Sequence, residues 1–403
     1  MDTHKQFRIL WIGQSFANLG DVFYMVGLIT LTYQLTQSAT IMSLIPFTIT
    51  TAMFLSGFIT PLLVDHVRLK PLLCWAQLLK TVLLLGMTIR LTFSLDTKWL
   101  PVTFGVVALI AFLDGTANPV RNAFVPQLVQ PDRLVKANSF LAVIDQSIRL
   151  GGMPLGSLLV LWIGAMPLLW MVFGFFMLAS LFMALLPDVT TDEPMKTRQT
   201  WESIREGWST IWQSPSLKAI TLMNISETIA SVVWIAAILY IYVEEVLHVS
   251  TAWWGYINGA FFGGLIVGGL FCLKFDHLIT RYTGAFMVAG LAGTSVITFW
   301  FGLTSVPLLA LGLSAVIGIF TQMKDIAQTT VIQTHSPKHL LAKVYSAQDT
   351  LMTGLFGVSS LIVGYMTDLW NVRVSFIAAA GLLLIASGIA ILKMGQLKIM
   401  SEE

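Results

Sequence analysis

The sequence predicts an all-α membrane protein with twelve transmembrane helices in two six-helix halves and with both termini in the cytoplasm. Three observations predict this fold: a high apolar content, a series of apolar runs long enough to cross a bilayer, and an uneven distribution of Lys and Arg along the chain. The chain has 403 residues, of which 56% are hydrophobic and 11% are charged, and its mean hydropathy is +0.79. Soluble domains carry about 25% charged residues, so the composition excludes an ordinary soluble protein.

The apolar runs divide into two sets separated by a polar interval at 188–216. We expect three parts: 1–187 as a six-helix bundle, 188–216 as a cytoplasmic linker, and 217–403 as a second bundle. The expected spans are 9–33, 40–64, 71–93, 100–121, 137–162, 167–187, 217–243, 252–273, 284–303, 307–326, 344–367 and 374–392. The first run contains Asp21 and lacks a small-residue cleavage site, so we interpret it as a retained span rather than a signal peptide.

The orientation follows from the positive-inside rule. With the N-terminus inside, most of the 23 lysines and arginines fall in segments on the cytoplasmic side, and only Arg90, Lys98 and Arg373 fall outside. Both termini are therefore expected in the cytoplasm. Cys74 and Cys272 lie near helix ends on this reducing side, and we interpret them as packing residues.

An internal repeat supports the division into two halves. The segment PQLVQPDRLVKAN begins at Pro126, and IQTHSPKHLLAKV begins at Ile332. Gln127, Pro131 and Leu134 correspond to Gln333, Pro337 and Leu340, each at an offset of 206 residues. Two related six-helix halves are typical of transporters that rock about a site near the midplane of the membrane.

The linker contains a helical pattern. Trp201, Ile204, Trp208 and Ile211 recur at helical spacing, whereas Glu202, Arg205 and Glu206 occupy the opposite face. This pattern predicts an amphipathic helix along the cytoplasmic surface. We interpret it as a strap that joins the two halves, with a regulatory or lipid-sensing role as the alternative.

Several classes of function are excluded by the composition. A net charge of +2 provides no basic surface for nucleic acid, and no phosphate-binding G-x-x-x-x-G-K-[ST] motif occurs, so we expect an energy source other than bound ATP. No metal-ligand cluster and no nucleophile–base arrangement is visible in the sequence. We therefore expect neither an enzyme nor a protein with a metal or cofactor.

Ionisable residues inside the spans are the strongest functional signal. A charge at the centre of a membrane-spanning helix costs about 2.5–3.5 kcal/mol, so such residues usually face a cavity and have a function. Spans six, nine and twelve contain no Asp, Glu, Lys or Arg. We single out the following charged residues inside the spans: Asp21 in span one, Lys80 in three, Asp114 in four, Asp145 and Arg149 in five, Glu227 in seven, and Lys324 and Asp325 in ten.

Several of these charges lie near the expected midplane. At a rise of about 1.5 Å per residue, Asp21 and Arg149 lie roughly 18 Å from the inner end, Glu227 roughly 15 Å and Asp145 roughly 12 Å. Asp114 lies roughly 21 Å along its helix from the outer end, whereas Lys324 and Asp325 approach the cytoplasmic end. This depth is typical of substrate and ion sites in transporters.

The local spacing suggests different roles for these residues. Asp145 and Arg149 are spaced i,i+4 and are expected to pair on one helix face. Asp21 and Glu227 have no opposite charge within one helical turn. A carboxyl group in a low-dielectric cavity favours its neutral form and is suited to carrying a proton. We leave two interpretations open for these acids: a direct coupling or substrate role, or an ion pair with a distant residue such as Arg149 or Lys80.

Glycine, proline and aromatic residues add expectations about packing. Gly264 and Gly268 in span eight, like Gly255, Gly259 and Gly263, are spaced i,i+4 and predict close helix packing. Pro154, with Gly156, is expected to bend span five at an outer gate. Aromatic residues near the expected cavity are interpreted mainly as packing residues, with contact to an apolar substrate as the alternative: Phe16, Phe23, Tyr24, Trp234 and Tyr240.

These motifs resemble the major facilitator superfamily, and more narrowly the macrolide-efflux branch of its drug:proton antiporters. NPVRNAFVPQLVQPDRLVKANS, from Asn118 to Ser139, is similar to that branch's P-x-R-x-A, P-x-L-V-P and L-x-x-A-N-S, and GQSFANLGD and IREGWSTIWQSPSL also match. The resemblance covers nearly the whole chain. It implies the major facilitator fold, and a motif position for Arg121.

Two further family motifs are present in altered form. The loop PLLVDHVRLK is similar to G-x-L-A-D-R-x-G-R-K and keeps Asp65 and Lys70, but Pro61 replaces the glycine. The antiporter motif G-P-x-x-G-G is reduced to MPLGS, which keeps Pro154 and Gly156. The resemblance implies that these residues, together with Arg121, belong to the motifs that control conformational change.

From these observations we expect a secondary active transporter that exports a small hydrophobic or amphiphilic compound of the drug or antibiotic type by proton-coupled alternating access. Asp21 is the first candidate for coupling, followed by Glu227, Asp114 and Asp145. Arg149 is expected to shift the pKa of whichever of these acids it contacts. Export of an endogenous siderophore, peptide antibiotic or lipid is the alternative, as is a membrane receptor without transport. The expected partners are the substrate, protons and the bilayer, and we expect a monomer in the plasma membrane, the bacterial inner membrane.

Overall fold

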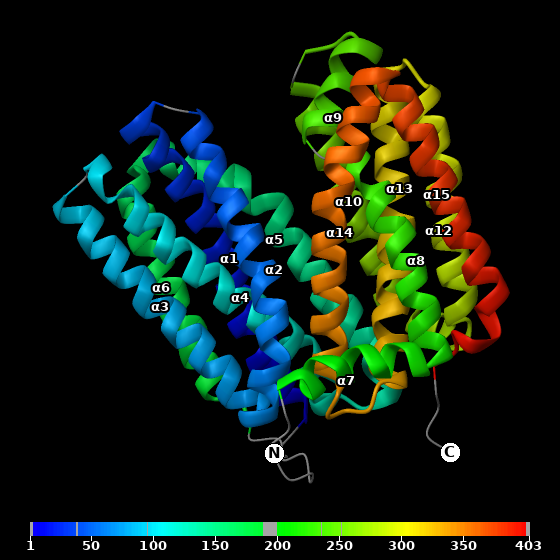
Figure 1. Ribbon diagram of the computed structural model, residues 1–403, viewed down its shortest axis with the longest axis horizontal. Coiled ribbons are helices and arrows are strands. Elements are labelled where there is room, and N and C mark those ends of the chain that lie inside the picture. Colours follow the sequence, from blue (N-terminus) through cyan, green and yellow to red (C-terminus); the bar gives the residue numbers. More distant parts are fainter. Residues whose placement is uncertain are drawn as a thin grey trace. The chain divides into compact units, whose positions relative to one another are not determined.

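The computed structural model describes residues 3–37, 39–94, 96–187, 200–234, 236–250 and 252–399, and within these ranges the secondary structure consists of helices (Figure 1). This confirms the predicted all-helical class. Residues 188–199 of the predicted linker lie outside the described part of the chain.

The first half of the sequence forms long helices at the predicted spans. They begin after short loops that often carry proline at the first helical turn, where its missing N–H is not needed, as at Pro101 and Pro131. The elements are α1 (Thr3–Thr36), α2 (Ala39–His66), α3 (Leu69–Phe93), η1 (Thr97–Trp99), α4 (Leu100–Leu128), η2 (Pro131–Arg133), α5 (Leu134–Ile163) and α6 (Ala165–Ala184).

The second half begins with the predicted amphipathic helix, which is confirmed as α7. Ser214 then caps the next helix, whose first residue is Pro215. The elements are α7 (Thr200–Gln213), α8 (Pro215–Ser231), η3 (Val232–Trp234), α9 (Ala236–Ile241), η4 (Tyr242–Val246), α10 (Ala252–Lys274), α11 (Asp276–Arg281), α12 (Thr283–Leu303), α13 (Pro307–His335), α14 (Leu341–Leu369), α15 (Val372–Lys393) and η5 (Met394–Gln396).

The predicted count of twelve membrane-spanning helices is confirmed in part. Ten helices of the described chain are long and apolar enough to cross a membrane, and the bent pair Pro215–Trp234 and Ile238–Val246 makes up to 11. The predicted span over 217–243 corresponds to this bent pair, whose two helices meet at 50°. The helix α5 covers the predicted fifth span but is not among the ten, and Asp145 and Arg149 lower its apolarity.

The chain divides into two compact units, and each takes a short segment from the other half of the sequence. Unit 1 is Met1–Val129, Ser147–Trp208 and Lys338–Thr350; unit 2 is Gln130–Gln146, Ser209–Pro337 and Leu351–Glu403. Adding 206 to the ends of Gln130–Gln146 gives 336 and 352, close to the ends of Lys338–Thr350. The two repeats therefore exchange equivalent segments, the beginnings of α5 and α14. The boundaries of two separate bundles at 187 and 217 stay a prediction.

Each unit has its own apolar core. In unit 1, α6 packs along α1 and α3, and α4 packs along α2 and α3. Leu84, Leu168 and Phe176 are fully buried there. In unit 2, the ring of Tyr242 lies 4.8 Å from that of Phe301 and 5.0 Å from that of Phe376, measured between centroids.

The candidate cavity aromatics are packed against other rings. Trp234 lies 4.7 Å from Phe301, Tyr240 stacks on Trp254 at 5.5 Å, and Phe16 and Phe23 each lie 6.0 Å from Phe175. These four residues thus contribute to packing, and contact with an apolar substrate stays a prediction.

Close packing by glycine is found in only part of α10. A Cβ atom on Gly264 would collide with the backbone of Ala315, and one on Gly268 would lie 2.6 Å from the carbonyl oxygen of Ile319. These two glycines therefore permit the close approach of α10 and α13, as predicted. Among the described residues, Gly255, Gly259 and Gly263 have no neighbour within 4 Å of an added Cβ atom, so the prediction of close packing there is wrong.

Candidate functional site

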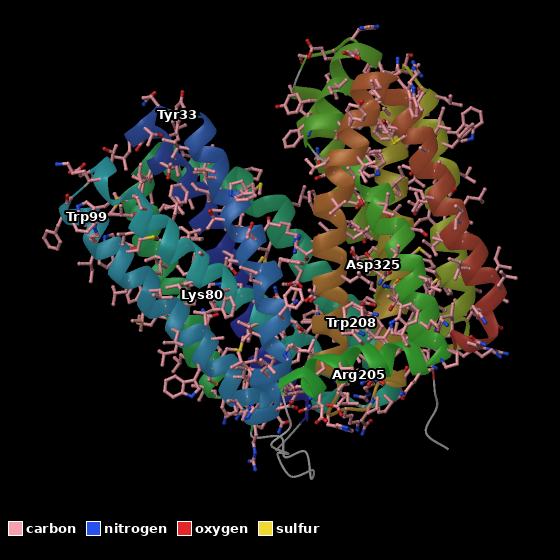
Figure 2. The ribbon with its side chains drawn as sticks, in the orientation of Figure 1. Tyr33, Lys80, Trp99, Arg205, Trp208 and Asp325 are labelled. Atoms are coloured by element: carbon pink, nitrogen blue, oxygen red, sulfur yellow. The ribbon has the colours of Figure 1, made fainter. Side chains whose placement is uncertain are left out.

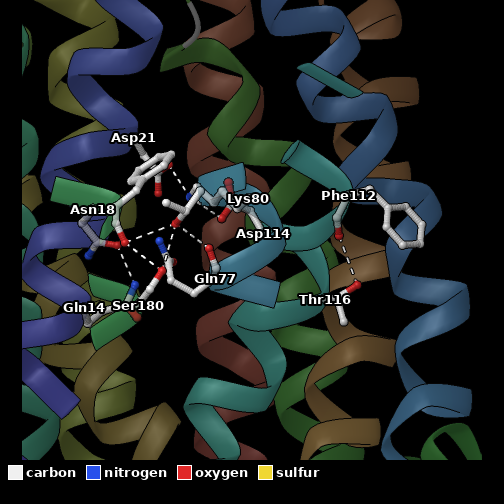
Figure 3. A network of polar contacts seen from close by, with 11 residues as sticks. Gln14, Asn18, Asp21, Gln77, Lys80, Phe112, Asp114, Thr116 and Ser180 are labelled. Carbon is white, nitrogen blue, oxygen red and sulfur yellow. Dashed lines mark hydrogen bonds and ion pairs between the residues drawn. The ribbon is translucent and has the colours of Figure 1, made fainter. Parts of the chain in front are cut away.

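The first candidate site is a cluster of three charged residues in the interior of unit 1 (Figures 2 and 3). Asp21 lies on α1, Lys80 on α3 and Asp114 on α4. The ammonium group of Lys80 donates to Asp114 Oδ1 at 2.5 Å and forms an ion pair with Asp21 Oδ1. The side chain of Lys80 is 2% exposed, compared with 35% for Asp21 and 28% for Asp114. A buried cation is thus shared by two acids that remain partly accessible.

The packing of α6 fixes the position of this lysine. The Lys80 ammonium lies 4.4 Å from the centroid of the Phe176 ring on α6, at a distance typical of a cation–π contact. A Cβ atom on Gly20 would lie 2.5 Å from this ring, so the glycine next to Asp21 leaves the space that Phe176 fills. Lys80 therefore joins helices and forms an ion pair with Asp21, whereas a coupling role for Asp21 stays a prediction.

Polar groups extend this cluster along α1 and α3. Gln14 Nε2 donates to Asn18 Oδ1 at 2.7 Å, one turn before Asp21, and the hydroxyls of Thr81 and Ser180 lie 2.9 Å apart. The Tyr24 hydroxyl and Gln77 Nε2 are buried without a hydrogen-bond partner among the residues that the structure describes. Buried polar groups are usually satisfied, so unpaired groups beside a charge cluster are a feature of functional sites.

A second cluster of the same composition lies in unit 2. Lys324 on α13 donates to both carboxylate oxygens of Glu227 on α8 at 2.6 Å, and it lies 2.6 Å from Asp325 Oδ1. The side chain of Lys324 is 4% exposed, whereas those of Glu227 and Asp325 are 21% and 45% exposed. Gln328 Nε2 donates to Asn224 Oδ1 at 2.9 Å, one helical turn from the ion pairs.

The internal repeat relates one acid and one asparagine of the first cluster to an acid and an asparagine of the second. Asn18 and Asp21 on α1 correspond to Asn224 and Glu227 on α8, again at an offset of 206 residues. The other charges do not correspond, because the offset from Lys80 and Asp114 leads to Phe286 and Phe320. The offset seen in the loops identifies Glu227 as the repeat equivalent of Asp21. Nothing in the sequence indicates which lysine forms an ion pair with each acid.

The net charge of the two clusters indicates what chemistry they are suited to. Two ionised carboxylates and one ammonium have a net charge of −1, and keeping an uncompensated charge away from water is costly. Uptake of one proton makes such a cluster neutral. The arrangement is therefore suited to proton exchange, or to binding a ligand that compensates the negative charge.

A third group of charges joins α2, α7 and α14 within unit 1. Lys343, whose side chain is 2% exposed, forms an ion pair with Asp65 and another with Glu206 at 2.8 Å. The Ser203 hydroxyl donates to Asp65 and to the carbonyl oxygen of Pro61, the latter at 3.2 Å. Sequence reasoning noted Asp65 but missed Lys343 and Ser203, because their partners come from distant segments.

The other predicted motif residues lie in several places. Gly152 and Gly156 of α5 face Val22, Phe23 and Val26 of α1, where added Cβ atoms would lie 2.9–3.3 Å from the nearest side-chain atoms. The small residues of the motif thus permit α5 to lie beside the segment of α1 that carries Asp21. Pro154 is exposed on α5, which runs through it as one helix, and the predicted bend stays a prediction.

Asp145 and Arg149 differ in their surroundings. Asp145 is half-buried in unit 2, and Arg149 is exposed in unit 1, although both lie on α5. Their pairing stays a prediction. Lys70 is half-buried at the beginning of α3. Arg121 on α4 interacts electrostatically with Asp349 on α14, an acid that sequence reasoning did not single out.

The fold and the sites together define a class. A chain of long apolar helices, with lysine–carboxylate clusters inside two repeat-related units, is a polytopic membrane transporter. The sequence matches the family model "Major Facilitator Superfamily" over residues 10–358. The chain belongs to this superfamily.

Relatives and solved structures agree with this assignment. The chain is 27% identical over 385 residues to the uncharacterized MFS-type transporter YfmI of Bacillus subtilis and 28% identical over 389 residues to YjbB of the same organism, covering 95% of each. The structure resembles the fucose:proton symporter FucP of E. coli, with a TM-score of 0.75 at 14% identity, covering 98% of this chain and 99% of that one. It also resembles a bacterial homologue of the iron transporter ferroportin in an outward-facing state, with a TM-score of 0.74 at 13% identity, covering 96% and 98%.

Proposed function

We propose that this protein is a proton-coupled secondary transporter that exports a small hydrophobic or amphiphilic compound from the cell by alternating access. The observation that carries the proposal is the cluster of Asp21, Lys80 and Asp114: a charged group of net −1 held inside a helical bundle of a transporter family. Residues at such positions are expensive to maintain and usually mark ion or substrate pathways. FucP, a protein of similar fold, is a fucose:proton symporter, which supports protons as the coupling ion.

The proposed topology has twelve spans with cytoplasmic termini in the bacterial plasma membrane. Ten of these spans are the helices that are long and apolar enough to cross a membrane. The bent pair from Pro215 to Val246 is the seventh span, and α5 is the fifth span. The predominance of Lys and Arg in the inner segments supports this orientation. The protein works as a monomer, with the substrate, protons and lipid as its partners and no cofactor.

Asp21 is the proposed coupling residue. When the cluster is open to the outside, Asp21 takes up a proton and the cluster becomes neutral, with Asp114 still paired to Lys80. When the cluster opens to the cytoplasm, the proton leaves and the negative charge returns. Because the lysine is almost fully buried and the acids are not, protons reach the acids and the lysine keeps its place.

The available energy is sufficient for uphill export. A tenfold proton gradient supplies about 1.4 kcal/mol, and a membrane potential of about 100 mV adds roughly 2.3 kcal/mol per charge. One proton per cycle therefore supports a concentration ratio of several hundred for an uncharged substrate.

The network of Asp65, Lys343 and Glu206 is the proposed conformational lock. It connects α14 to α7 and to the end of α2, where Asp65 belongs to the motif PLLVDHVRLK. Breaking these ion pairs releases the beginning of α14 from the end of α2. Lys70, Arg121, Pro154 and Gly156 belong to the same motifs by resemblance and are proposed to act in the same conformational change.

The narrower assignment to drug efflux is proposed from the resemblance to the macrolide-efflux branch in the segment from Asn118 to Ser139. The alternative cargo is an endogenous siderophore, peptide antibiotic or lipid. A receptor without transport is the remaining alternative, and the buried charge clusters favour transport over it.

A substrate screen tests the proposal. Cells that express the protein are loaded with a panel of apolar dyes and antibiotics, and accumulation is measured with and without an uncoupler. At least one compound is expected to accumulate less in expressing cells than in cells without the protein, and the difference is expected to disappear when the proton gradient is dissipated. Lower accumulation that persists with the uncoupler would exclude proton coupling, and equal accumulation of all compounds would argue for another cargo or a receptor.

A further inference from the structure

We propose that Glu227, Lys324 and Asp325 form a second proton-exchange site, so that the protein exchanges two protons per cycle, one in each unit. The inference rests on the proposed function and goes beyond it, because proton coupling needs only the Asp21 cluster.

The first support is the position of the second cluster in the repeat. Glu227 stands where Asp21 stands in the first half, and the asparagine one turn before it is also repeated, as Asn224 and Asn18. The helices that carry these pairs also have corresponding neighbours: α1 packs along α6, and α8 packs along α15. The acid of the second unit therefore lies on the equivalent helix at an equivalent position.

The second support is the charge balance. Both clusters have two carboxylates and one lysine, and both lysines are at most 4% exposed while their acids are between 21% and 45% exposed. Each cluster becomes neutral when it takes up one proton, and each offers its acids rather than its lysine to protons that enter. The physical argument for proton exchange at Asp21 thus applies equally to Glu227.

The third support is that the two clusters have the same net charge, although their lysine and second acid come from different positions in the repeat. In unit 1 the lysine and the second acid come from α3 and α4, whereas in unit 2 they are adjacent on α13. A structural ion pair needs one acid and one lysine. The second acid at Asp325 brings the net charge of the cluster to −1, as the second acid does in the Asp21 cluster.

The charged groups that act on Glu227, among the described residues, are the other two members of the cluster. The helices that pack most extensively against α8 are α15 and α13. From α13, Lys324 and Asp325 are the charged groups that act on Glu227. From α15, Arg373 is bound to the carbonyl oxygen of Gly302 and to Ser305, and Lys393 is exposed at the opposite end. On α14, the uncharged Met352 accepts a hydrogen bond from Thr228 through its sulfur at 3.1 Å.

A buried acceptor lies next to the site. Gln328 Oε1 has no hydrogen-bond partner within the described part of unit 2, although its side-chain amide donates to Asn224. Gln328 follows Lys324 by one helical turn, and Asn224 precedes Glu227 by one turn. The cluster therefore has an unsatisfied acceptor close by, and a protonated carboxyl is a donor where an ionised one is not.

Infrared difference spectroscopy of the purified full-length protein tests this inference without a known substrate. Spectra of protein in detergent are recorded between about pH 6 and pH 9, where exposed carboxyls, with pKa values of about 3.9 and 4.3, remain ionised. Carbonyl bands of protonated carboxyls that change in this range report acids that exchange protons under working conditions. We expect two bands: one lost in Asp21→Asn, and another lost in Glu227→Gln.

A second variant keeps the test valid if Glu227→Gln fails to fold. Asp325→Asn leaves Glu227 and Lys324 as a balanced pair, so we expect it to remove the second band while the first is unchanged. Glu202→Gln, an exposed substitution of the same type on α7, is the control and is expected to keep both bands.

The possible results separate the two proposals. Two independently lost bands support the second site. A single band that is lost in Asp21→Asn and is unchanged in both Glu227→Gln and Asp325→Asn overturns the second site but leaves the proposed function standing. If no band depends on Asp21 or on Glu227, both the second site and proton coupling at the first are overturned.

Discussion

At the scale of single residues, the main feature is that each buried lysine is shared by two acids. Lys80 contacts Asp21 and Asp114, Lys324 contacts Glu227 and Asp325, and Lys343 contacts Asp65 and Glu206. The acids could be listed from the sequence because a charge in an apolar run is conspicuous. Their partners could not be assigned, because each partnership depends on how helices distant in sequence pack.

The stability of the first cluster can be tested by removing its cation. Lys80→Met leaves Asp21 and Asp114 close together without compensation, and breaking a buried ion pair costs about 3–5 kcal/mol. Since both acids are partly exposed, we expect a loss near the lower end, about 3 kcal/mol, measured as a lower melting temperature in detergent. Lys98→Met, on an exposed lysine, is expected to change little.

The triple variant Lys80→Met, Asp21→Asn, Asp114→Asn is expected to recover part of this loss, because it contains no unpaired charge. A Lys80→Met protein as stable as Lys98→Met would mean that the ion pairs do not hold α1, α3 and α4 together.

At the scale of helices, the sequence predicted most spans but not their irregularities. Apolar runs locate α3, α6, α10 and α12 well, because a helix in lipid must remain apolar along its length. The break in the segment from Pro215 to Val246 was missed because hydropathy does not record a bend. The pattern of Trp201, Ile204, Trp208 and Ile211 did predict α7, since amphipathic spacing is a direct signal.

Packing between α10 and α13 provides a test at this scale. Gly264→Ala places a Cβ atom against the Ala315 backbone, which has no room to yield, and overpacking costs about 1–3 kcal/mol. We expect a lower melting temperature in detergent. Gly259→Ala on the same helix has open space around it and is expected to be neutral or stabilising, because alanine favours a helix by up to about 1 kcal/mol. Equal effects of the two substitutions would contradict the close contact.

At the scale of the whole molecule, the repeat organises both structure and proposed function. The two units exchange the equivalent segments Gln130–Gln146 and Lys338–Thr350, and the repeat-related acids Asp21 and Glu227 lie in different units. The offset of 206 residues was visible in the loops, so the two related halves could be predicted. The exchange of segments could not, because it depends on packing between helices far apart in sequence.

Proton movement in proteoliposomes tests the coupling mechanism most directly. Purified protein is reconstituted with a pH-sensitive dye inside the vesicles, and a compound from the accumulation screen is added on one side. The wild-type protein and the exposed control Asp132→Asn are expected to move protons when the compound is added. Asp21→Asn is expected to move none while remaining folded in the membrane, because the transport cycle cannot be completed without proton exchange at Asp21, even with Glu227 intact. Proton movement in Asp21→Asn equal to that of the wild type would contradict a coupling role for Asp21 and its cluster.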